Sequence, residues 1–178
     1  VLAMGGASWP KLGSDGAWQS WLQEAGVRVA PLQPSNCGFD AEWSTFIREH
    51  FAGAPLKSVI ARYTDNEGNI HSREGECVIT EHGLEGSLIY ALSSGLRDVI
   101  AENGSVTLYL DLFPHHTAIS LSEKLNKTRG KNSLSSHWRK TIGLEGVKAA
   151  LVREQLSNDQ LNSAEAVATA LKSLPIVL

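Results

Sequence analysis

The feature of this chain most able to do chemistry is a pair of glycines that follows an apolar run at the start of the sequence. Residues 1–4 predict a buried strand, Gly5 and Gly6 predict a tight turn, and residues 15–18 predict the start of an amphipathic helix. Because glycine has no Cβ, a strand, glycine turn and helix let backbone N–H groups approach a phosphate or a flavin edge. The fuller fingerprint, G-x-G-x-x-G with an acidic residue about 20 positions on, is absent. We therefore expect half of a nucleotide-binding unit, in a chain that is a piece of a larger protein.

A second pattern lies directly after the glycines. Ser8 and Lys11 have the S-x-x-K spacing of a serine–lysine nucleophile pair. That chemistry needs a helical turn to bring the amine to the hydroxyl, and Pro10 disfavours such a helix because it moves the preceding residue out of the α region. A catalytic serine is therefore the weaker interpretation. Trp9, in the same loop, is the tryptophan that we place near a ligand, and no residue of the chain is assigned a catalytic role.

The histidines and cysteines do not have the spacing of a metal site. His115 and His116 are adjacent, so on an extended segment they face opposite ways and do not easily bind one metal ion. We expect a solvated or helix-start pair there, and ordinary polar surface at the loop residue His82. Cys37 and Cys77 lie 40 positions apart without a C-x-x-C motif, which predicts free thiols in a reducing cytosol. No metal is expected.

A run of basic residues is the remaining candidate for ligand binding. Against the single acid Glu123, residues 123–140 carry Lys124, Lys127, Arg129, Lys131, Arg139 and Lys140, with Trp138 among them. Such a patch on short helices could hold phosphate, either of nucleic acid or of the adenylate end of a cofactor. The net charge of −3 favours instead a solvated face that is balanced by acids elsewhere. Nucleic acid is therefore a disfavoured partner.

Composition sets wider limits. At 178 residues and 42% hydrophobic content, the chain can bury a core and suits one large domain or two small ones. Charged residues make up 20%, and no segment approaches the roughly 18 consecutive apolar residues that a membrane span needs. Neither a membrane nor a bulk polyanion is implied, and we expect a cytoplasmic protein.

The elements that would position these residues begin with helical periodicity. Residues 13–26 predict a helix because Trp18, Trp21, Leu22 and Ala25 recur at i, i+3, i+4 and i+7, with Gly26 at its end. A short strand is expected at 27–31 and a helix at 40–51. Their helical spacing makes Trp18, Trp21 and Trp43 candidates for the core.

From residue 56 the period changes to two, and then to short helices. We expect strands at 56–63, 69–73, 76–80 and 106–112, and helices at 88–101, 120–127, 133–142, 146–156 and 163–174. Glu74 and Gly75 separate two of the strands, and residues 120–123 have the spacing of a capping box. Residues 175–178 predict the start of a strand that the chain does not finish. A mostly β unit of about 27–114 thus precedes a helical unit of about 115–174.

Residues 1–16 resemble the second flavin-proximal motif of the YhiN-like (BaiN-type) NAD(P)/FAD-dependent oxidoreductases. The family pattern is close to v-l-A-T-G-G-x-S-x-P-x-x-G-S-x-G, and this chain departs from it at Met4, where threonine is usual. The resemblance continues through residues 34–39, 51–57 and 75–86 and covers nearly the whole chain. The chain is most similar to a bacterial subgroup of flavoproteins within that family.

The resemblance implies an insert domain, a β-barrel followed by a small helical bundle, that interrupts a Rossmann-type FAD-binding domain. The implied fold class is α+β in several parts: a small mixed β-barrel-like unit followed by a small helical bundle, excised from that host. The implied boundaries are 1–34 for a segment of the FAD-binding domain, 35–114 for the barrel, 115–174 for the helices and 175–178 for the start of a return strand. Ala3, Gly5 and Gly6 would lie near the FAD of the parent protein.

The resemblance also implies a function. The parent would transfer hydride or electrons through FAD, and this chain, its insert or substrate-capping domain, would be inactive alone and bind no cofactor. Its partners would be the remainder of the FAD-binding domain, a small-molecule substrate and NAD(P)H, and a homo-oligomer is compatible. The alternative from another class is a non-enzymatic module that binds nucleic acid or protein, since a small barrel followed by basic helices also suits that role.

Overall fold

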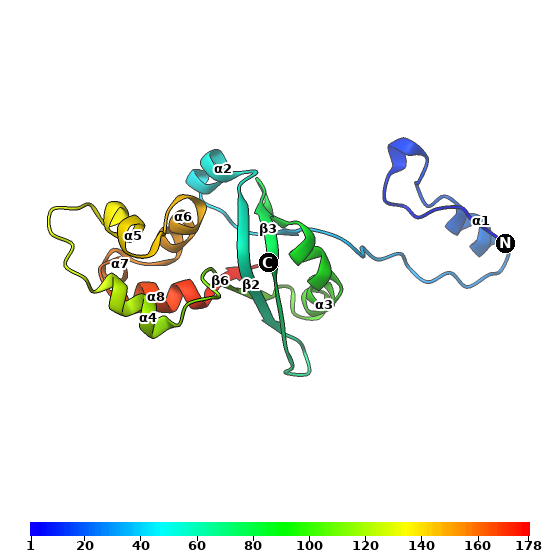
Figure 1. Ribbon diagram of the computed structural model, residues 1–178. Coiled ribbons are helices and arrows are strands. Elements are labelled where there is room, and N and C mark those ends of the chain that lie inside the picture. The colour runs from blue at the N-terminus through cyan, green and yellow to red at the C-terminus, as the bar shows by residue number, and fades with distance from the viewer. The chain divides into compact units, whose positions relative to one another are not determined.

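Six strands of the chain pair into one antiparallel sheet that curves into a half-barrel, in the order β1-β4-β3-β2-β5-β6 (Figure 1). The computed structural model describes all residues, 1–178. The strands are β1 (Phe39–Asp40), β2 (Pro55–Thr64), β3 (Ile70–Ile79), β4 (Gly83–Glu85), β5 (Thr107–Asp111) and β6 (Leu174–Val177). The α+β class is confirmed, and every strand pair is antiparallel where we expected a mixed unit. The expected strands at 56–63 and 106–112 are confirmed as β2 and β5.

The long hairpin of β2 and β3 differs from the sequence prediction. We expected Glu74 and Gly75 to separate two strands, but β3 runs through both of them, paired with β2. The ten-residue partner strand supplies hydrogen bonds on both sides of this point, which outweighs the weak strand propensity of a single glycine. Gly75 also lets helix α3 approach, because a Cβ there would lie 3.2 Å from the Cβ of Leu88.

Helix α3 (Ser87–Asn103) covers one face of the sheet, as the periodicity of residues 88–101 predicts. Its apolar stripe is buried, with Leu88, Leu92 and Leu96 against the strands. A glycine is needed at position 95, because a Cβ there would overlap the hydroxyl of Tyr63 on β2. The helix ends at Gly104 in the left-handed region, which glycine tolerates without strain.

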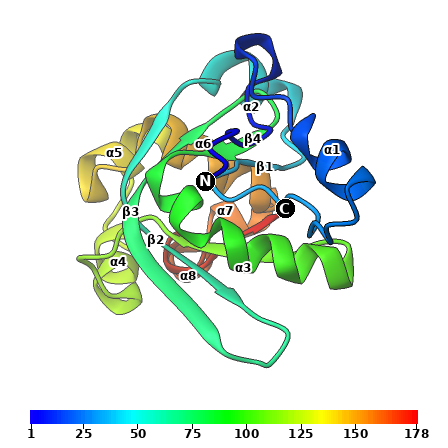
Figure 2. The ribbon, with the colours of Figure 1, turned by 90° about the vertical axis from the view of Figure 1, so that its right-hand side faces the viewer.

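The remaining helices of residues 35–178 lie on the opposite side of the sheet from α3, as both ribbon views show (Figures 1 and 2). Four of the five that follow β5 match the four helices predicted there, and α7 was missed. The helices on this side of the sheet are α2 (Thr45–Phe51), α4 (Ala118–Leu125), α5 (Leu134–Ile142), α6 (Gly146–Gln155), α7 (Asn158–Leu161) and α8 (Ala164–Lys172).

Side-chain caps mark the start of each of these helices except α6. The predicted capping box at residues 120–123 is wrong, because Thr117 caps α4 by accepting a hydrogen bond from the Ser120 N–H. The complete capping box belongs to α7, where Ser157 and Gln160 exchange hydrogen bonds. Helix α7 has only four residues, too few to show a hydrophobic period, so its cap was the only local signal.

The helix expected at 40–51 begins later than predicted. Phe39 and Asp40 pair with β4, and α2 starts at Thr45 because the Ser44 hydroxyl accepts a hydrogen bond from the Ile47 N–H. Trp43 is buried as expected, at 7% exposure, and its indole N–H donates to the Gly83 carbonyl. Tertiary packing of this tryptophan thus replaces the first helical turn.

The sheet and the helices share one core. Their buried apolar side chains form a single cluster, from Trp43 near the first strand to Ile176 in the last. Polar groups join the two layers as well: the Lys172 amine on α8 lies 2.6 Å from the Asp111 carboxylate at the end of β5 and donates to the Phe113 carbonyl. Lys148 on α6 donates to the Leu112 carbonyl at 2.7 Å. The helices are therefore fixed to the end of β5.

Residues 1–34 form a compact unit separate from residues 35–178. The unit contains a short 3₁₀ helix, η1 (Pro10–Leu12), and α1 (Trp18–Glu24). The strands expected at 1–4 and 27–31 are absent, because a strand needs a neighbour for its N–H and C=O groups and this unit holds no sheet. The core role expected of Trp21 is also wrong, since its side chain is 63% exposed and α1 buries no residue.

No helix in the structure combines the length and apolar content that crossing a membrane requires.

Candidate functional site

The loop around Gly5 and Gly6, which we call the glycine loop, is held by hydrogen bonds within residues 1–34. Gly5 has a φ of +70°, a conformation that L side chains rarely adopt, and its carbonyl accepts a hydrogen bond from the Trp18 indole at 3.0 Å. Backbone hydrogen bonds between Trp9 and Ser14 close the following turn. Gly16 is required where the loop meets α1, because its φ is +74° and a Cβ would lie 2.8 Å from the Cβ of Ala7.

This loop presents backbone groups to its surroundings. Ala3, Gly5 and Gly6 are exposed, and the N–H groups of both glycines donate to no acceptor in the chain. A Cβ at Gly6 would meet nothing within 4 Å, so the space above that residue is open. The loop therefore has the free donors and the clearance that a phosphate or flavin edge needs, although residues 1–13 are all exposed and do not enclose such a ligand.

The S-x-x-K pattern is not assembled into a nucleophile. Pro10 starts η1 between the two residues, and no hydrogen bond joins the Ser8 hydroxyl to the Lys11 amine. Both side chains are exposed. Trp9, which we placed near a ligand, is 62% exposed and lies in the same turn.

A groove lies where the first and the last strand of the sheet approach each other. It has a volume of about 610 Å³ and is lined by residues 40–43, Gln155 and residues 175–178. Trp43 and Ile176 give it an apolar floor, and Asp40 and Glu42 stand on one side. Because β1 and β6 are the outer strands of the half-barrel, this groove is the open seam between its two edges, and we call it the seam groove. Periodicity and motifs did not indicate it, since residues 40 and 178 are far apart in the chain.

A buried thiol and a half-buried amine lie near the junction of sheet and helices. Burial raises the pKa of the Cys77 thiol to about 12, with the Lys148 ammonium opposing the shift. Burial also lowers the pKa of Lys148, while Asp111 and Cys77 act in the other direction. A thiol with so high a pKa is protonated at neutral pH and is a poor nucleophile. Cys37 and Cys77 are both free, as predicted, and Cys77 has a packing role.

Sequence reasoning missed a carboxylate–imidazole pair at the tip of the β2–β3 hairpin. The Asp65 carboxylate lies 2.7 Å from His71 Nε2 and also accepts hydrogen bonds from the N–H groups of Glu67 and Asn69. The His71 bond, followed by the backbone bonds, lowers the pKa of Asp65 to about 2. The His71 ring stacks on Tyr63, whose pKa is raised by burial and by nearby carboxylates. The pair closes the turn, and an aspartate before a glycine-containing turn was the available signal.

The predicted surface histidines stay at the surface. His82 and His115 are exposed, and His116 packs beside the Phe113 ring, with the ring centroids 6.1 Å apart. The structure contains no group of three or more histidine, cysteine, aspartate or glutamate side chains arranged to hold a metal ion.

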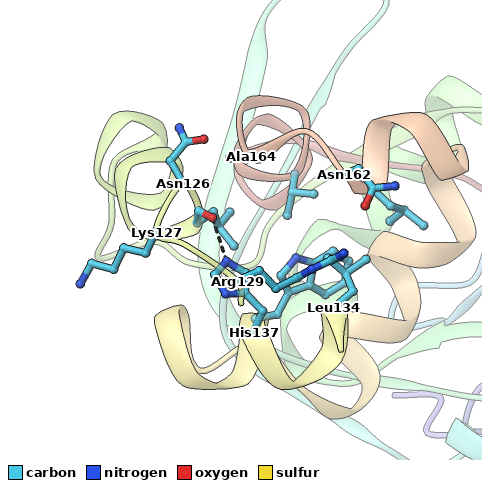
Figure 3. Close-up of a pocket in the computed structure, with 11 residues that line it drawn as sticks. Asn126, Lys127, Arg129, Leu134, His137, Asn162 and Ala164 are labelled. Atoms are coloured by element: carbon cyan, nitrogen blue, oxygen red, sulfur yellow. Dashed lines mark hydrogen bonds between the residues drawn. The ribbon is translucent and has the colours of Figure 1, made fainter. Parts of the chain in front are cut away.

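The basic run is distributed over several elements. Lys124 lies on α4, Lys131 lies in the α4–α5 connection, and Arg139 and Lys140 lie on α5. Only Lys127 and Arg129 line a pocket between the α4–α5 connection and the starts of α5 and α8 (Figure 3). The structure thus separates one pair of basic residues from the rest of the run.

Comparison with known proteins gives one family. A model described as HI0933-like protein barrel and H2TH domain matches residues 33–178. The match spans the half-barrel and all the helices that follow it, and it leaves out the glycine loop. No curated protein matches the chain.

Proposed function

The chain belongs to the HI0933-like family, whose barrel and H2TH domain matches residues 33–178, and from this we propose a function for it. We propose that residues 35–178 cover the flavin of a FAD-dependent oxidoreductase and shape its substrate pocket. Members of this family are FAD flavoproteins. The observation that carries the proposal is the family match over the unit that contains the seam groove. The enzyme's substrate, NAD(P)H and the remainder of the FAD-binding domain are then the partners of this chain.

The seam groove supports a role at a domain boundary. The groove joins the first and the last strand of the sheet, and a neighbouring domain packed there would contact both outer strands at once. Ligand pockets occur preferentially at such boundaries, where two domains enclose a ligand that neither encloses alone. The apolar floor of Trp43 and Ile176 suits the body of an organic substrate, with the polar groups of Asp40 and Glu42 at the rim.

The glycine loop supports contact with the cofactor. When bound, FAD supplies the hydride or electron transfer, and the protein positions it. In this chain Gly5 and Gly6 would donate backbone N–H groups to one edge of the cofactor, and Ala3 would lie beside it. The remaining contacts are not offered by residues 1–34, which are exposed around the loop. We therefore expect residues 1–178 alone to retain no flavin and to be inactive.

The visible absorption spectrum of the natural protein that carries these residues, purified from cells, tests the proposal. The wild-type protein should hold FAD, and Gly6→Val should weaken FAD binding at least about tenfold, because the added side chain blocks a close approach. No neighbour lies within 4 Å of that Cβ, so the loop itself tolerates it. Ala25→Val, on the exposed end of α1, is the matched control and should bind FAD normally. A colourless wild-type protein that takes up no FAD would refute the proposal.

A further inference from the structure

The pocket beside the α4–α5 connection has an unusual charge balance. Its volume is about 280 Å³, and the charged side chains that line it are those of Lys127 and Arg129, with no carboxylate. Neither side chain donates a hydrogen bond or forms an ion pair within the protein. In a chain whose net charge is −3, this is a cavity with positive charge that no internal acid neutralises.

A buried imidazole adds a further polar group. His137 lines the pocket and is only 6% exposed, and its Nε2 donates a hydrogen bond to the Leu125 carbonyl at 2.8 Å. That bond leaves Nδ1 without a partner in the protein. Every fully buried side-chain nitrogen or oxygen in the structure has a hydrogen-bond partner. Since Nδ1 of His137 has none, this atom is not fully buried and is accessible to solvent. His137 thus adds a polar ring nitrogen to the lining of the pocket.

The backbone around the pocket also favours a negatively charged ligand. Leu134 and Ala164, the first residues of α5 and α8, both line the pocket. Their N–H groups lie in the first helical turn, where they have no intrahelical acceptor and carry the positive end of the helix dipole. Figure 3 shows Arg129 beside Leu134 and His137, while Lys127 points away toward solvent. Arg129 is thus the cation that lies closest to the helix start.

We propose that this pocket binds the phosphate monoester group of a small molecule, with Arg129 as its principal charged ligand. A phosphate monoester carries about −1.5 to −2 charges at pH 7 and three strong acceptor oxygens, which the guanidinium fork and the helix N–H groups match. The pocket is of a size for one phosphate group with part of its carrier, and the negative net charge disfavours a long polyanion. This site is separate from the seam groove and stands whether or not the chain serves a flavin.

Titration of the full chain with inorganic phosphate and with AMP, followed by amide NMR shifts at constant ionic strength, tests the proposal. Both ligands should saturate the protein, with a dissociation constant on the order of 1 mM for inorganic phosphate and a lower one for AMP. The shifts should centre on Arg129, Leu134 and Ala164 and leave Val177 on β6 unchanged. Arg129→Gln should weaken binding about tenfold, because a charge-assisted hydrogen bond is lost.

Lys131→Gln provides the matched control, because it removes the same charge from the same connection at a residue outside the pocket lining. It should leave the affinity for phosphate within about twofold of wild type. Equal weakening by both variants, or the absence of saturation, would overturn the proposal. So would tighter and steeply salt-dependent binding of a dT oligonucleotide with shifts along the whole basic run, since that pattern identifies a nucleic-acid surface.

Discussion

The two units of the chain, residues 1–34 and residues 35–178, differ in how far they bury their tryptophan side chains. Three of the five tryptophans lie in the first unit, where Trp9 and Trp21 are 62% and 63% exposed. The two tryptophans of the second unit, Trp43 and Trp138, are 7% and 1% exposed. The first unit therefore presents aromatic surface and free glycine N–H groups, while the second has its own core.

The two units also differ in how specific their sequence motifs are and in how well their side chains pack. The most specific motif of the chain lies in residues 1–34, where α1 buries no residue. The match to the family model covers residues 33–178, which contain the packed core. A short segment without a sheet cannot bury enough apolar surface to offset its conformational entropy. We therefore expect residues 1–34 to be the less stable of the two units.

Amide hydrogen exchange gives the largest expected contrast between the two units. The amide of Leu110 on β5, a strand between β2 and β6, should be protected by a factor of at least about 10⁴ over the unfolded chain. The amide of Ala25, which follows the last residue of α1, should show little protection, because that helix buries no residue. Comparable protection in both would mean that residues 1–34 are as stably folded as the core.

Truncation of matched leucines probes packing directly. Leu108→Ala, at a fully buried position on β5, should lower the free energy of unfolding by about 3 kcal/mol, because it leaves a cavity in the shared core. Leu12→Ala, where the side chain is 79% exposed, should change it by less than about 0.5 kcal/mol. Urea unfolding monitored by circular dichroism measures both, and a large effect at Leu12 would contradict the division into units.

The ion pair between α8 and β5 tests how the helices are fixed to the sheet. Lys172→Met should cost about 3 kcal/mol of unfolding free energy, because it leaves the buried Asp111 carboxylate without its cation. The double variant that also carries Asp111→Asn should recover part of this loss, since no uncompensated charge remains. Failure of the second substitution to recover any stability would show that the amine acts through packing alone.

The smallest effect is expected at the hairpin tip, where pH is the variable. The hydrogen bond from His71, with those from Asn69 and Glu67, holds the folded pKa of Asp65 at about 2, below its ordinary value of 3.8. The stabilisation is therefore fully present above about pH 4 and is lost as the pH falls toward 2. The stability difference between wild type and Asp65→Ala should shrink over that window. A difference that stays constant down to pH 2 would contradict this role for the carboxylate.

Local patterns predicted the elements whose hydrophobic period is long and clear. The alternation of residues 106–112 and the stripe of residues 88–101 correspond to β5 and α3, because each buries one face against the core. The strand expected at residues 1–4 failed for the opposite reason, since the pattern was present but no neighbouring strand was. The short helix α7 and the later start of α2 depended on caps that periodicity does not detect.

The sequence by itself determined the class of the fold, the family resemblance and the glycine loop as a place of backbone donors, because each depends on residues adjacent in the chain. Only the tertiary structure decided which distant residues meet. The seam groove joins residues 40–43 to residues 175–178, and the pocket beside the α4–α5 connection joins Arg129 to the starts of two helices. Contacts of this kind are set by how the sheet curves and how the helices pack on it, and a linear pattern holds no record of either.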